Sequence, residues 1–314
     1  MAKPTGAALT VLSVLMAAGL AVLPVLSGPA SAASKRPKPS PSPTATATPA
    51  PAPVVSPAPV ASPAPSTGST SPTPTPSPIA TPSYWKPAQG TSWQIQYTGT
   101  LDTSVAAAVY NVDGFDTSAQ TVAALKSSGR HAICYFSAGS YEDWRPDAAS
   151  FPASVLGRSN GWAGERWLDI RQLDVLKPIL TNRIRMCRDK GFSAVDPDNV
   201  DGYTNSTGFA LTAADQLTFN RWLAVTAHAH GMSIGLKNDL DQIPELVNDF
   251  DFAVNEQCFQ YDECQAVRPF TDAGKAVFHI EYSTSPASYC PTTTAMGFSS
   301  LLKTLNLSAT RQTC

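Results

Sequence analysis

Three carboxylates lie within six positions of the chain, at Asp196, Asp198 and Asp201. They follow an apolar run at residues 192–195, and a strand must end near Pro197 because proline has no N–H to donate to a ladder. Carboxylates at close range resist joint ionisation, and α/β folds place their chemistry at the carboxyl ends of strands. We therefore interpret this cluster as a catalytic site, since perturbed carboxylates gather at such sites.

A solvated turn or a calcium loop is the alternative interpretation of the cluster. An EF-hand loop needs oxygen ligands at its first, third and fifth positions and glycine at its sixth. Counted from Asp196, the fifth residue is Val200 and the sixth is Asp201, so the calcium pattern is not met.

A sequence pattern that recurs before and after the cluster indicates the fold. A predicted helix ends at a glycine, a short apolar strand follows, and the strand ends in polar residues. The helices are predicted at 118–126, 173–190 and 212–230, the last with a capping box from Thr212 and Asp215. The strands are predicted at 109–113, 132–137, 166–170, 193–196, 233–237, 252–255, 277–281 and 298–302. Eight such units predict a (β/α)₈ TIM barrel.

An open doubly wound sheet is the alternative fold. No G-x-G-x-x-G or G-x-x-x-x-G-K turn follows any predicted strand, which weakens a nucleotide-binding version of that fold.

In a barrel, the polar ends of the strands converge on one face. We expect this face to carry Asp198 and Glu256 together with substrate-binding residues Asp116, Tyr135, Asp169, Asp196, Asp201, Tyr203, Lys237, Asn238, Asn255, Glu281 and Tyr282. Aromatic residues lie in or near the same loops, and their faces suit the C–H faces of sugar rings; they are Tyr135, Trp144, Trp162, Tyr203, Tyr261 and Tyr282.

Other chemistries find little support in the sequence. There is no G-x-S-x-G elbow of a serine hydrolase. His228 and His230 are two residues apart on a predicted helix and so point in different directions, which does not suit a metal pair. We expect no metal and no cofactor. What remains is acid–base or nucleophilic work by carboxylates, which is glycosidase chemistry.

Four phrases at strand ends give the sequence a resemblance to a known family. They are Trp167-Leu168-Asp169-Ile170-Arg171, Asp196-Pro197-Asp198-Asn199-Val200-Asp201-Gly202-Tyr203, Gly235-Leu236-Lys237-Asn238-Asp239 and Phe252-Ala253-Val254-Asn255-Glu256-Gln257-Cys258. Together they resemble glycoside-hydrolase family 114, over about residues 93–282. The resemblance implies a (β/α)₈ barrel that acts as a secreted endo-α-1,4-polygalactosaminidase.

The resemblance also implies roles for single residues. Asp198 and Glu256 would be the catalytic pair, and Asp196, Asp201, Lys237, Asn238 and Asn255 would surround it. One departure is Asp196, because many relatives carry glutamate there, and this shortens a side chain in the pocket.

The first ninety residues predict export and a tether. Lys3, the apolar run 7–26 and the small residues Ala30-Ser31-Ala32 predict a signal peptide over 1–32. A transmembrane anchor is the alternative, but Pro24 closes the apolar run early. Residues 33–90 hold 17 of the 28 prolines and no acidic residue, so we expect a disordered Pro/Ala/Ser/Thr-rich linker.

The remaining 91–314 suit one glycoside-hydrolase domain with a full core. All 24 acidic residues lie in it, whereas five of the 22 basic residues precede it, so the domain is strongly acidic. This excess argues against nucleic acid as a partner and favours a neutral or cationic ligand, although solubility alone also explains it.

Six cysteines lie in this domain, and behind an export signal an even number indicates disulfides. Fifteen pairings are open to six cysteines. Proximity favours Cys258–Cys264 and Cys290–Cys314, which leaves Cys134–Cys187. A zinc site is the alternative, but no C-x-x-C spacing supports it.

The sequence therefore predicts a secreted, extracellular endo-glycosidase that hydrolyses an amino-sugar polysaccharide. We expect a monomer with no membrane contact after signal cleavage and no nucleic-acid partner. The alternatives are a non-catalytic polysaccharide-binding barrel and a glycosidase of different polymer specificity.

Overall fold

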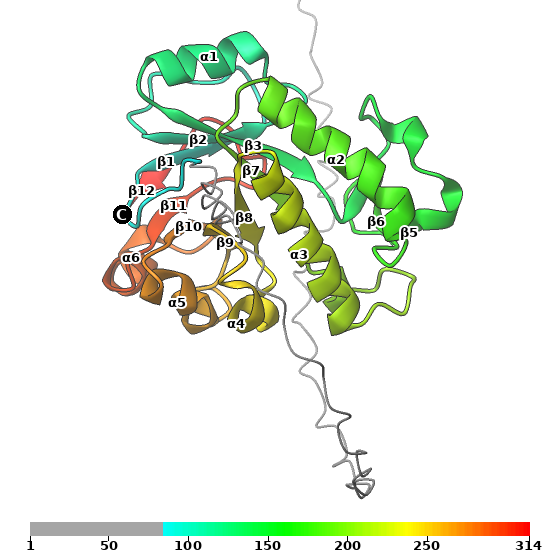
Figure 1. Ribbon diagram of the computed structural model, residues 1–314. Helices are drawn as coiled ribbons and strands as arrows, with labels where there is room; N and C mark the ends of the chain where they lie inside the picture. Colours follow the sequence, from blue (N-terminus) through cyan, green and yellow to red (C-terminus); the bar gives the residue numbers. More distant parts are fainter. Residues whose placement is uncertain (1–83) are drawn as a thin grey trace, which may run out of the picture. The chain divides into compact units, whose positions relative to one another are not determined.

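A computed structural model describes residues 84–314 of the chain (Figure 1). The predicted signal peptide and the linker up to residue 83 lie outside the described residues. Within the described part, no helix is both long enough and apolar enough to span a bilayer.

The domain is built on eight parallel strands in sequential spatial order, as in a TIM barrel. They are β1 (Trp93–Gln96), β2 (Val109–Asp113), β3 (His131–Ser137), β7 (Ala194–Asp198), β8 (Ser233–Lys237), β9 (Phe252–Glu256), β10 (Ala276–Glu281) and β11 (Ser299–Leu302). A ninth strand, β12 (Gln312–Thr313), pairs antiparallel with β11.

Helices cover the outside of this sheet (Figure 1). They are α1 (Ala119–Ser127), α2 (Leu173–Asp189), α3 (Ala213–Ala229), α4 (Ile243–Leu246), α5 (Cys264–Asp272) and α6 (Pro286–Ala295). The predicted start signals are used: Ser118 caps α1, and Thr212 and Asp215 form the capping box of α3. Gly191 (φ 91°) and Gly231 (φ 71°) turn the chain after α2 and α3 in the left-handed conformation that glycine tolerates.

The alternation of side chains along each strand divides the core in two. One set fills the barrel interior: Trp93, Ile95, Val109, Ile133, Ala194, Phe252, Val254, Ala276, Phe278, Ile280 and Leu301. A larger set packs between the strands and the helices, for example Val195 and Ile234 against Leu180 and Phe219. Residues two positions beyond the interior set must therefore point into the carboxyl-end mouth of the barrel.

The C-terminal segment bridges β1 and β11. Trp93 Nε1 donates to the carbonyl of Ser299 at 2.8 Å. Further along, Gln94 Nε2 donates to the carbonyl of Ala309 at 2.7 Å. The backbone N–H of Tyr97 donates to the carbonyl of Leu307 at 2.9 Å. These contacts bring the first and last parallel strands of the barrel together.

Two strand predictions for the barrel are corrected. Residues 166–170 do not form a barrel strand: β6 (Glu165–Leu168) belongs to a separate antiparallel sheet with β4 (Ser140–Glu142) and β5 (Leu156–Ser159). The strand missing from the prediction is β1, whose four residues follow directly on a proline-rich stretch. One predicted barrel strand is lost and one is gained, so the number of barrel strands stays at eight. Asp198 and Glu256 still end the fourth and sixth of them.

Residues 84–90, the end of the predicted linker, contact the barrel. Trp85 stacks on His131 with ring centroids 4.0 Å apart, and Ala88 forms a bridge with Lys275. The two aromatic residues of this stretch, Tyr84 and Trp85, supply apolar surface that the proline-rich composition conceals.

The structure forms three disulfides, which are the two pairs that proximity in the sequence favours and the pair that remains. Their Cα–Cα distances are 5.9 Å for Cys134–Cys187, 4.6 Å for Cys258–Cys264 and 5.3 Å for Cys290–Cys314. The first ties β3 to α2, and the last ties α6 to the C-terminus.

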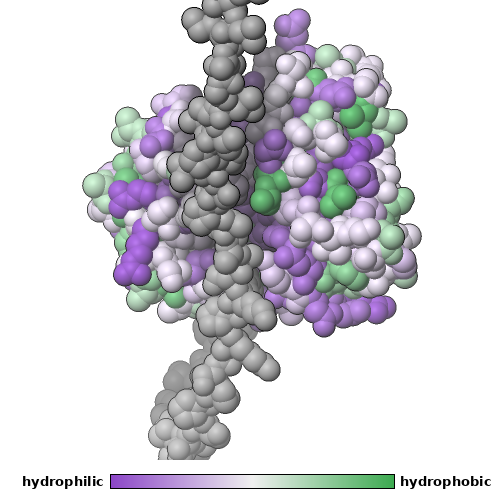
Figure 2. Space-filling model, turned by 180° about the vertical axis from the view of Figure 1, so that it is seen from behind, coloured by the Kyte–Doolittle hydropathy of each residue, from purple (hydrophilic) through white to green (hydrophobic). Residues whose placement is uncertain are grey.

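Where the surface of the domain is visible in Figure 2, hydrophilic residues mix with small groups of hydrophobic ones.

Candidate active site

A cavity of about 660 Å³ opens at the carboxyl ends of the barrel strands. Seven successive strands each send one polar side chain into it, from the last residue of the strand, from the residue just after or, on β3, from two residues before the end. In strand order these are Tyr97, Asp113, Tyr135, Asp198, Lys237, Glu256 and Tyr282. On its own strand, each of these residues belongs to the alternate set of side chains that points into the barrel. The alternation of side chains along the strands therefore brings the seven residues together.

Lys237 lies at the centre of the cavity floor. Its Nζ is 3.1 Å from Asp198 Oδ1 and 3.1 Å from Glu256 Oε2. Burial alone would lower the pKa of this ammonium, but the negative charges of Asp198, Glu256 and Asp196 outweigh burial and raise it. Lys237 is therefore a fixed cation that holds the two carboxylates close together.

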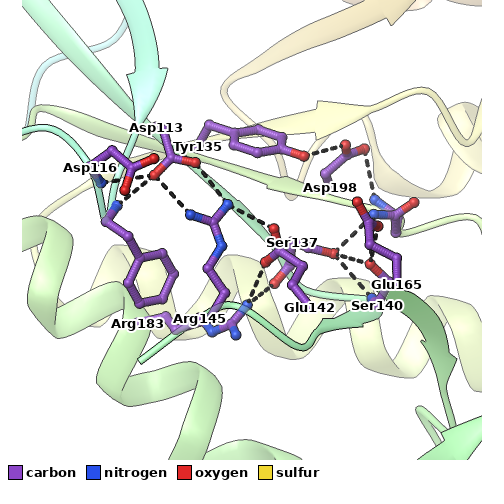
Figure 3. A network of polar contacts seen from close by, with 12 residues as sticks. Asp113, Asp116, Tyr135, Ser137, Ser140, Glu142, Arg145, Glu165, Arg183 and Asp198 are labelled. Carbon is purple, nitrogen blue, oxygen red and sulfur yellow. Dashed lines mark hydrogen bonds and ion pairs between the residues drawn. The ribbon is translucent and has the colours of Figure 1, made fainter. Parts of the chain in front are cut away.

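Asp198 has three donors around its carboxylate. Besides Lys237, Tyr135 Oη donates to Oδ2 at 3.0 Å, as Figure 3 shows, and the backbone N–H of Asn199 donates to Oδ1 at 2.8 Å. Asn199 adopts a left-handed conformation (φ 61°), which asparagine tolerates better than most residues. All three donors point at the carboxylate oxygens and fix the orientation of the side chain.

Glu256 is held from the neighbouring strand and from the next loop. Tyr282 Oη donates to Oε1, and Asn238 Nδ2 donates to Oε2 at 3.3 Å. The same Asn238 accepts the backbone N–H of Glu256 through Oδ1 at 2.9 Å, so one amide fixes both the backbone and the side chain.

Three tyrosines of the cavity remain neutral donors. Burial, together with the nearby carboxylates, raises the pKa of Tyr97, Tyr135 and Tyr282 well above its usual value. Tyr97 also stacks on Tyr135 with ring centroids 4.0 Å apart, which fixes the orientation of both rings.

Asp196 lies one layer below the cavity, two residues before Asp198 on β7. Its Oδ2 accepts hydrogen bonds from Asn111 Nδ2 at 2.7 Å and Tyr97 Oη at 3.4 Å. Its Oδ1 is buried and has no hydrogen-bond partner within the part of the chain that the structure describes. Burial raises the pKa of Asp196 to about 6, with the charge of Lys237 opposing the rise.

An ion-pair network borders the cavity on the side of the inserted sheet (Figure 3). Arg145 makes two bonds to Asp113, at 3.0 Å and 2.7 Å, and a third contact to Glu142 at 2.7 Å. Arg183 of α2 lies below, 2.8 Å from Asp147, and donates to the carbonyl of Ser137 at 2.6 Å. Burial raises the pKa of Glu142, although both arginines oppose this.

A chain of hydroxyls links this border to Asp198. Asn199 Nδ2 donates to Ser137 Oγ at 2.9 Å and to Ser140 Oγ at 3.1 Å, and Ser140 Oγ donates to Glu165 Oε2 at 2.9 Å. The residue that follows Asp198 is thus anchored to the β4–β6–β5 sheet.

The residues lining the cavity carry an excess of negative charge. Six are acidic (Asp113, Asp116, Glu142, Glu165, Asp198 and Glu256), whereas two are basic (Arg145 and Lys237). The two basic residues contact Asp113, Glu142, Asp198 and Glu256. Asp116 and Glu165 remain as carboxylates for which no such contact is formed by Arg145 or Lys237.

Most of the predicted site residues lie together. Asp198, Glu256, Asp116, Tyr135, Lys237 and Tyr282 line the cavity. Asn238 positions Glu256, and Asp196 lies directly below.

Seven predicted substrate-binding residues do not line the cavity: besides Asp196 and Asn238, they are five residues in two groups. Asn255 and Glu281 are each one position out of phase with the interior side of their strands, so they lie on the outer face of the sheet. There Glu281 Oε1 accepts the backbone N–H of Phe259 at 2.9 Å and contacts His279 Nε2 at 3.1 Å. Glu281 thus supports the loop that follows Glu256.

The other three lie beyond the cavity in inserted segments. Asp169 is paired with Arg171 through bonds of 2.7 Å and 2.9 Å beside the start of α2. Asp201 directly precedes a short 3₁₀ turn, Gly202–Thr204, which includes Tyr203. None of these three positions belongs to a barrel strand, so the convergence of strand ends does not bring them into the cavity.

Among the lining residues, sequence reasoning missed Tyr97, Glu142, Arg145 and Glu165, which carry charge or an aromatic ring. Tyr97 could have been found, because Trp93, Ile95 and Tyr97 alternate on one face of β1. The other three lie on or beside β4 and β6, and no pattern in the sequence shows that this sheet borders the barrel mouth.

One group of potential metal ligands occurs among residues 84–314, formed by Cys258, Cys264 and His279. Because the two cysteines form a disulfide, their sulfurs are not available as thiolate ligands.

The comparisons with known proteins agree with this geometry. The profile of glycoside-hydrolase family GH114 matches residues 74–314. A crystal structure of Aspergillus fumigatus Ega3 in complex with galactosamine is similar at 44% identity and a TM-score of 0.70, covering 73% of this chain and 97% of Ega3.

A more distant structure shares the fold. The glycoside hydrolase domain of PelA from Pseudomonas aeruginosa has 15% identity and a TM-score of 0.56, over 70% of this chain and 97% of that domain. Among curated protein sequences, none matches. The family profile covers the whole described domain and the Ega3 match is well above 30% identity, so this chain belongs to glycoside-hydrolase family GH114.

Proposed function

We propose that this protein is a secreted endo-glycosidase that hydrolyses α-1,4-linked galactosamine polysaccharide. The observation that carries the proposal is the pair Asp198 and Glu256, two carboxylates of one cavity that share the ammonium of Lys237. The 44% identity to Ega3, which was crystallised with galactosamine, supports the choice of sugar. The three disulfides fit an extracellular protein.

Asp198 is the nucleophile in this proposal, because its three donors stabilise the carboxylate. Glu256 is the acid/base: it gives its proton to the glycosidic oxygen while Asp198 Oδ attacks the anomeric carbon and the glycosidic bond breaks. The product is a glycosyl ester on Asp198. Glu256 then takes a proton from water, whose oxygen attacks the anomeric carbon and releases Asp198.

The separation of the two carboxylates supports retention of configuration. Asp198 Oδ1 and Glu256 Oε2 are each 3.1 Å from the same nitrogen, so these two oxygens cannot be further apart than twice that distance. Inverting glycosidases need about 6.5–9.5 Å between their carboxyl groups to admit a water molecule, whereas retaining enzymes have about 5–5.5 Å. This bound applies to the two nearest oxygens, and it is compatible with the carboxyl separation of a retaining pair.

The charge of the cavity supports an amino sugar with a free ammonium group. Six acidic lining residues face two basic ones, and Asp116 and Glu165 have no contact with either base. A protonated galactosamine unit would meet attractive carboxylates here, whereas an N-acetylated unit brings no positive charge.

The test is depolymerisation of de-N-acetylated and fully N-acetylated α-1,4-galactosamine polymer, scored by the size of the products. We expect short oligosaccharides from the first polymer and fewer from the second, with turnover of the cationic polymer falling as salt screens the charges. Equal rates on both polymers without a salt effect would contradict the charge argument. Polymer binding without any cleavage would favour the alternative, a polysaccharide-binding barrel.

The roles of the two acids can be separated with an aryl galactosaminide whose leaving group needs no protonation. Replacing Glu256 by glutamine should then slow the release of the aryl group much less than replacing Asp198 by asparagine. The reverse order would exchange the two roles.

A further inference from the structure

Exposed large hydrophobic side chains gather at the mouth of the cavity. Four such residues occur among residues 84–314: Trp144, Trp162, Leu305 and Val225. The first three line the cavity, and only Val225 lies elsewhere, on α3. Single exposed hydrophobics are ordinary on a soluble protein, but their concentration at one opening marks a binding surface.

The two tryptophans occupy the same wall. Trp144 follows β4, and Trp162 lies in the turn between β5 and β6, so both belong to the inserted antiparallel sheet. The backbone N–H of Asp143 donates to the carbonyl of Gly164 at 3.1 Å and joins the two loops. A side chain at position 164 would meet Trp144 Cζ3 at 2.9 Å, which shows how closely that indole packs on the turn.

The turn that carries Trp162 is held by hydrogen bonds. The backbone N–H of Trp162 donates to Asn160 Oδ1 at 3.1 Å, and its carbonyl accepts the N–H of Glu165 at 3.1 Å. Yet the side chain is 61% exposed, and that of Trp144 is 52% exposed. Indoles on a backbone fixed in this way offer a large apolar face at a low cost in conformational entropy.

A carboxylate lies beside these indoles. Glu165 accepts from Ser140 Oγ at 2.9 Å and from Asn160 Nδ2 at 2.6 Å, and both bonds go to Oε2. Its other oxygen, Oε1, forms no hydrogen bond with any residue of 84–314 and can meet a ligand. An apolar platform next to an anionic oxygen matches the two sides of an amino sugar: a C–H face for stacking and an ammonium for ion pairing.

We propose that Trp144, Trp162 and Glu165 form an additional sugar subsite, which binds amino-sugar units of the polymer beyond the unit that Asp198 attacks. The subsite makes the enzyme prefer long chains to short ones. It deepens the proposed function and rests on it, because the ligand is a further part of the same polymer.

The test compares Trp144→Ala, Trp162→Ala and Glu165→Gln with Val225→Ala, a control that removes an equally exposed apolar side chain away from the cavity. Each is assayed on long de-N-acetylated galactosamine polymer and on the shortest oligosaccharide that the wild type cleaves. For each tryptophan variant, KM on the polymer should rise about tenfold more than KM on the oligosaccharide, since one lost ring contact of about 1.4 kcal/mol is a factor of ten. The control should keep both constants.

Equal changes on both substrates, or no change on the polymer, would overturn the subsite. A direct measurement separates this outcome from a failure of the proposed function. Titration calorimetry with the same polymer should show weaker binding by the tryptophan variants than by Val225→Ala, even if the wild type cleaved nothing. Equal affinities in that titration would also overturn the subsite.

Discussion

The two ends of the barrel are built from similar residue types but handle charge in different ways. At the amino ends of the strands, Tyr84 stacks on His228 with ring centroids 5.0 Å apart, Trp85 stacks on His131, and Lys86 pairs with Asp251 at 2.7 Å. There, aromatic faces are covered by protein and an acid meets a base. At the carboxyl ends, indoles are exposed and carboxylates outnumber bases.

The difference separates a surface that stabilises the fold from one that is prepared for a ligand. A barrel gains stability when its polar groups are paired and its aromatic rings are covered. Exposed indoles and an excess of carboxylates at one end therefore indicate a binding surface for a ligand. Residues 84–90 pack at the opposite end, against the first residue of β3 and the residue before β10. Changes at the two ends should therefore have opposite consequences for activity and stability.

The largest expected effect is on turnover, from Asp198→Asn and Glu256→Gln. Each should lower kcat on galactosamine polymer by about 10²-fold or more, because each removes a group that acts on the reacting atoms. Circular dichroism should show that the fold survives. The matched control is Asp169→Asn. Asp169 is an acidic residue that pairs with Arg171 and lies outside the cavity. If Asp169→Asn were as inactive as Asp198→Asn, the assignment of the cavity would be wrong.

The next effect is on stability, from Lys237→Met. Removing one partner of a buried ion pair costs about 3–5 kcal/mol, and here two carboxylates lose their common cation. Urea unfolding at pH 7.5 should show this loss, and the loss should shrink towards pH 4 as protonation removes the repulsion. A variant as stable as the wild type at pH 7.5 would show that Lys237 does not hold the pair together.

Much of this molecule could be predicted from particular residues. The repeated glycine and apolar phrase located seven of the eight barrel strands, and Asp198, Lys237 and Glu256 followed from the polar ends of three of them. Which side chains of a strand point into the barrel follows from their alternation along the strand. Val254 and Glu256 share one face of β9, so Asn255 must lie on the opposite face.

The insertion could not be predicted in this way. Trp167, Leu168 and Ile170 give residues 166–170 the apolar character of a barrel strand, although β6 pairs antiparallel with β4 and β5. That choice depends on partners distant in the sequence: Arg145 joins the insertion to Asp113 of β2, and Asp147 joins it to Arg183 of α2. Local patterns carry no information about such pairings.

A third effect concerns the pH dependence of stability and follows from Asp196. Its pKa of about 6 in the fold lies above the value of 3.8 for an unperturbed carboxyl, chiefly because of burial. A raised pKa means that this group contributes stability below about pH 4 and that the contribution is lost as the pH rises through 6. Relative to the wild type, Asp196→Asn should therefore gain about 2–3 kcal/mol between pH 4 and pH 8.

Chemical unfolding of both proteins across this pH range tests the shift of Asp196. Asp251→Asn is a useful comparison, because its carboxyl lies at the other end of the barrel and has a lowered pKa, mainly through its bonds to His228 and Lys86 in spite of burial. Its difference from the wild type should grow in the opposite direction as the pH rises. Parallel curves for the two variants would contradict the contrast between the ends.

The smallest effect is expected from Trp85→Ala at the amino end. Loss of the stacked ring should lower the free energy of unfolding by about 1 kcal/mol beyond the loss of buried area. Both kcat and KM on the polymer should stay at wild-type values, because the contacts of Tyr84, Trp85 and Lys86 lie at the amino end of the barrel, away from the cavity. A change in KM would show that this segment reaches the substrate.

The most direct test of the shared Asp198–Lys237–Glu256 geometry is the configuration of the first product. Proton NMR of wild-type enzyme cleaving α-1,4-galactosamine polymer can resolve the anomer at each new reducing end before it mutarotates. The carboxylate separation set by Lys237 predicts that the α-anomer appears first. A β-anomer as the first product would contradict it and would make Asp198 a base that activates water.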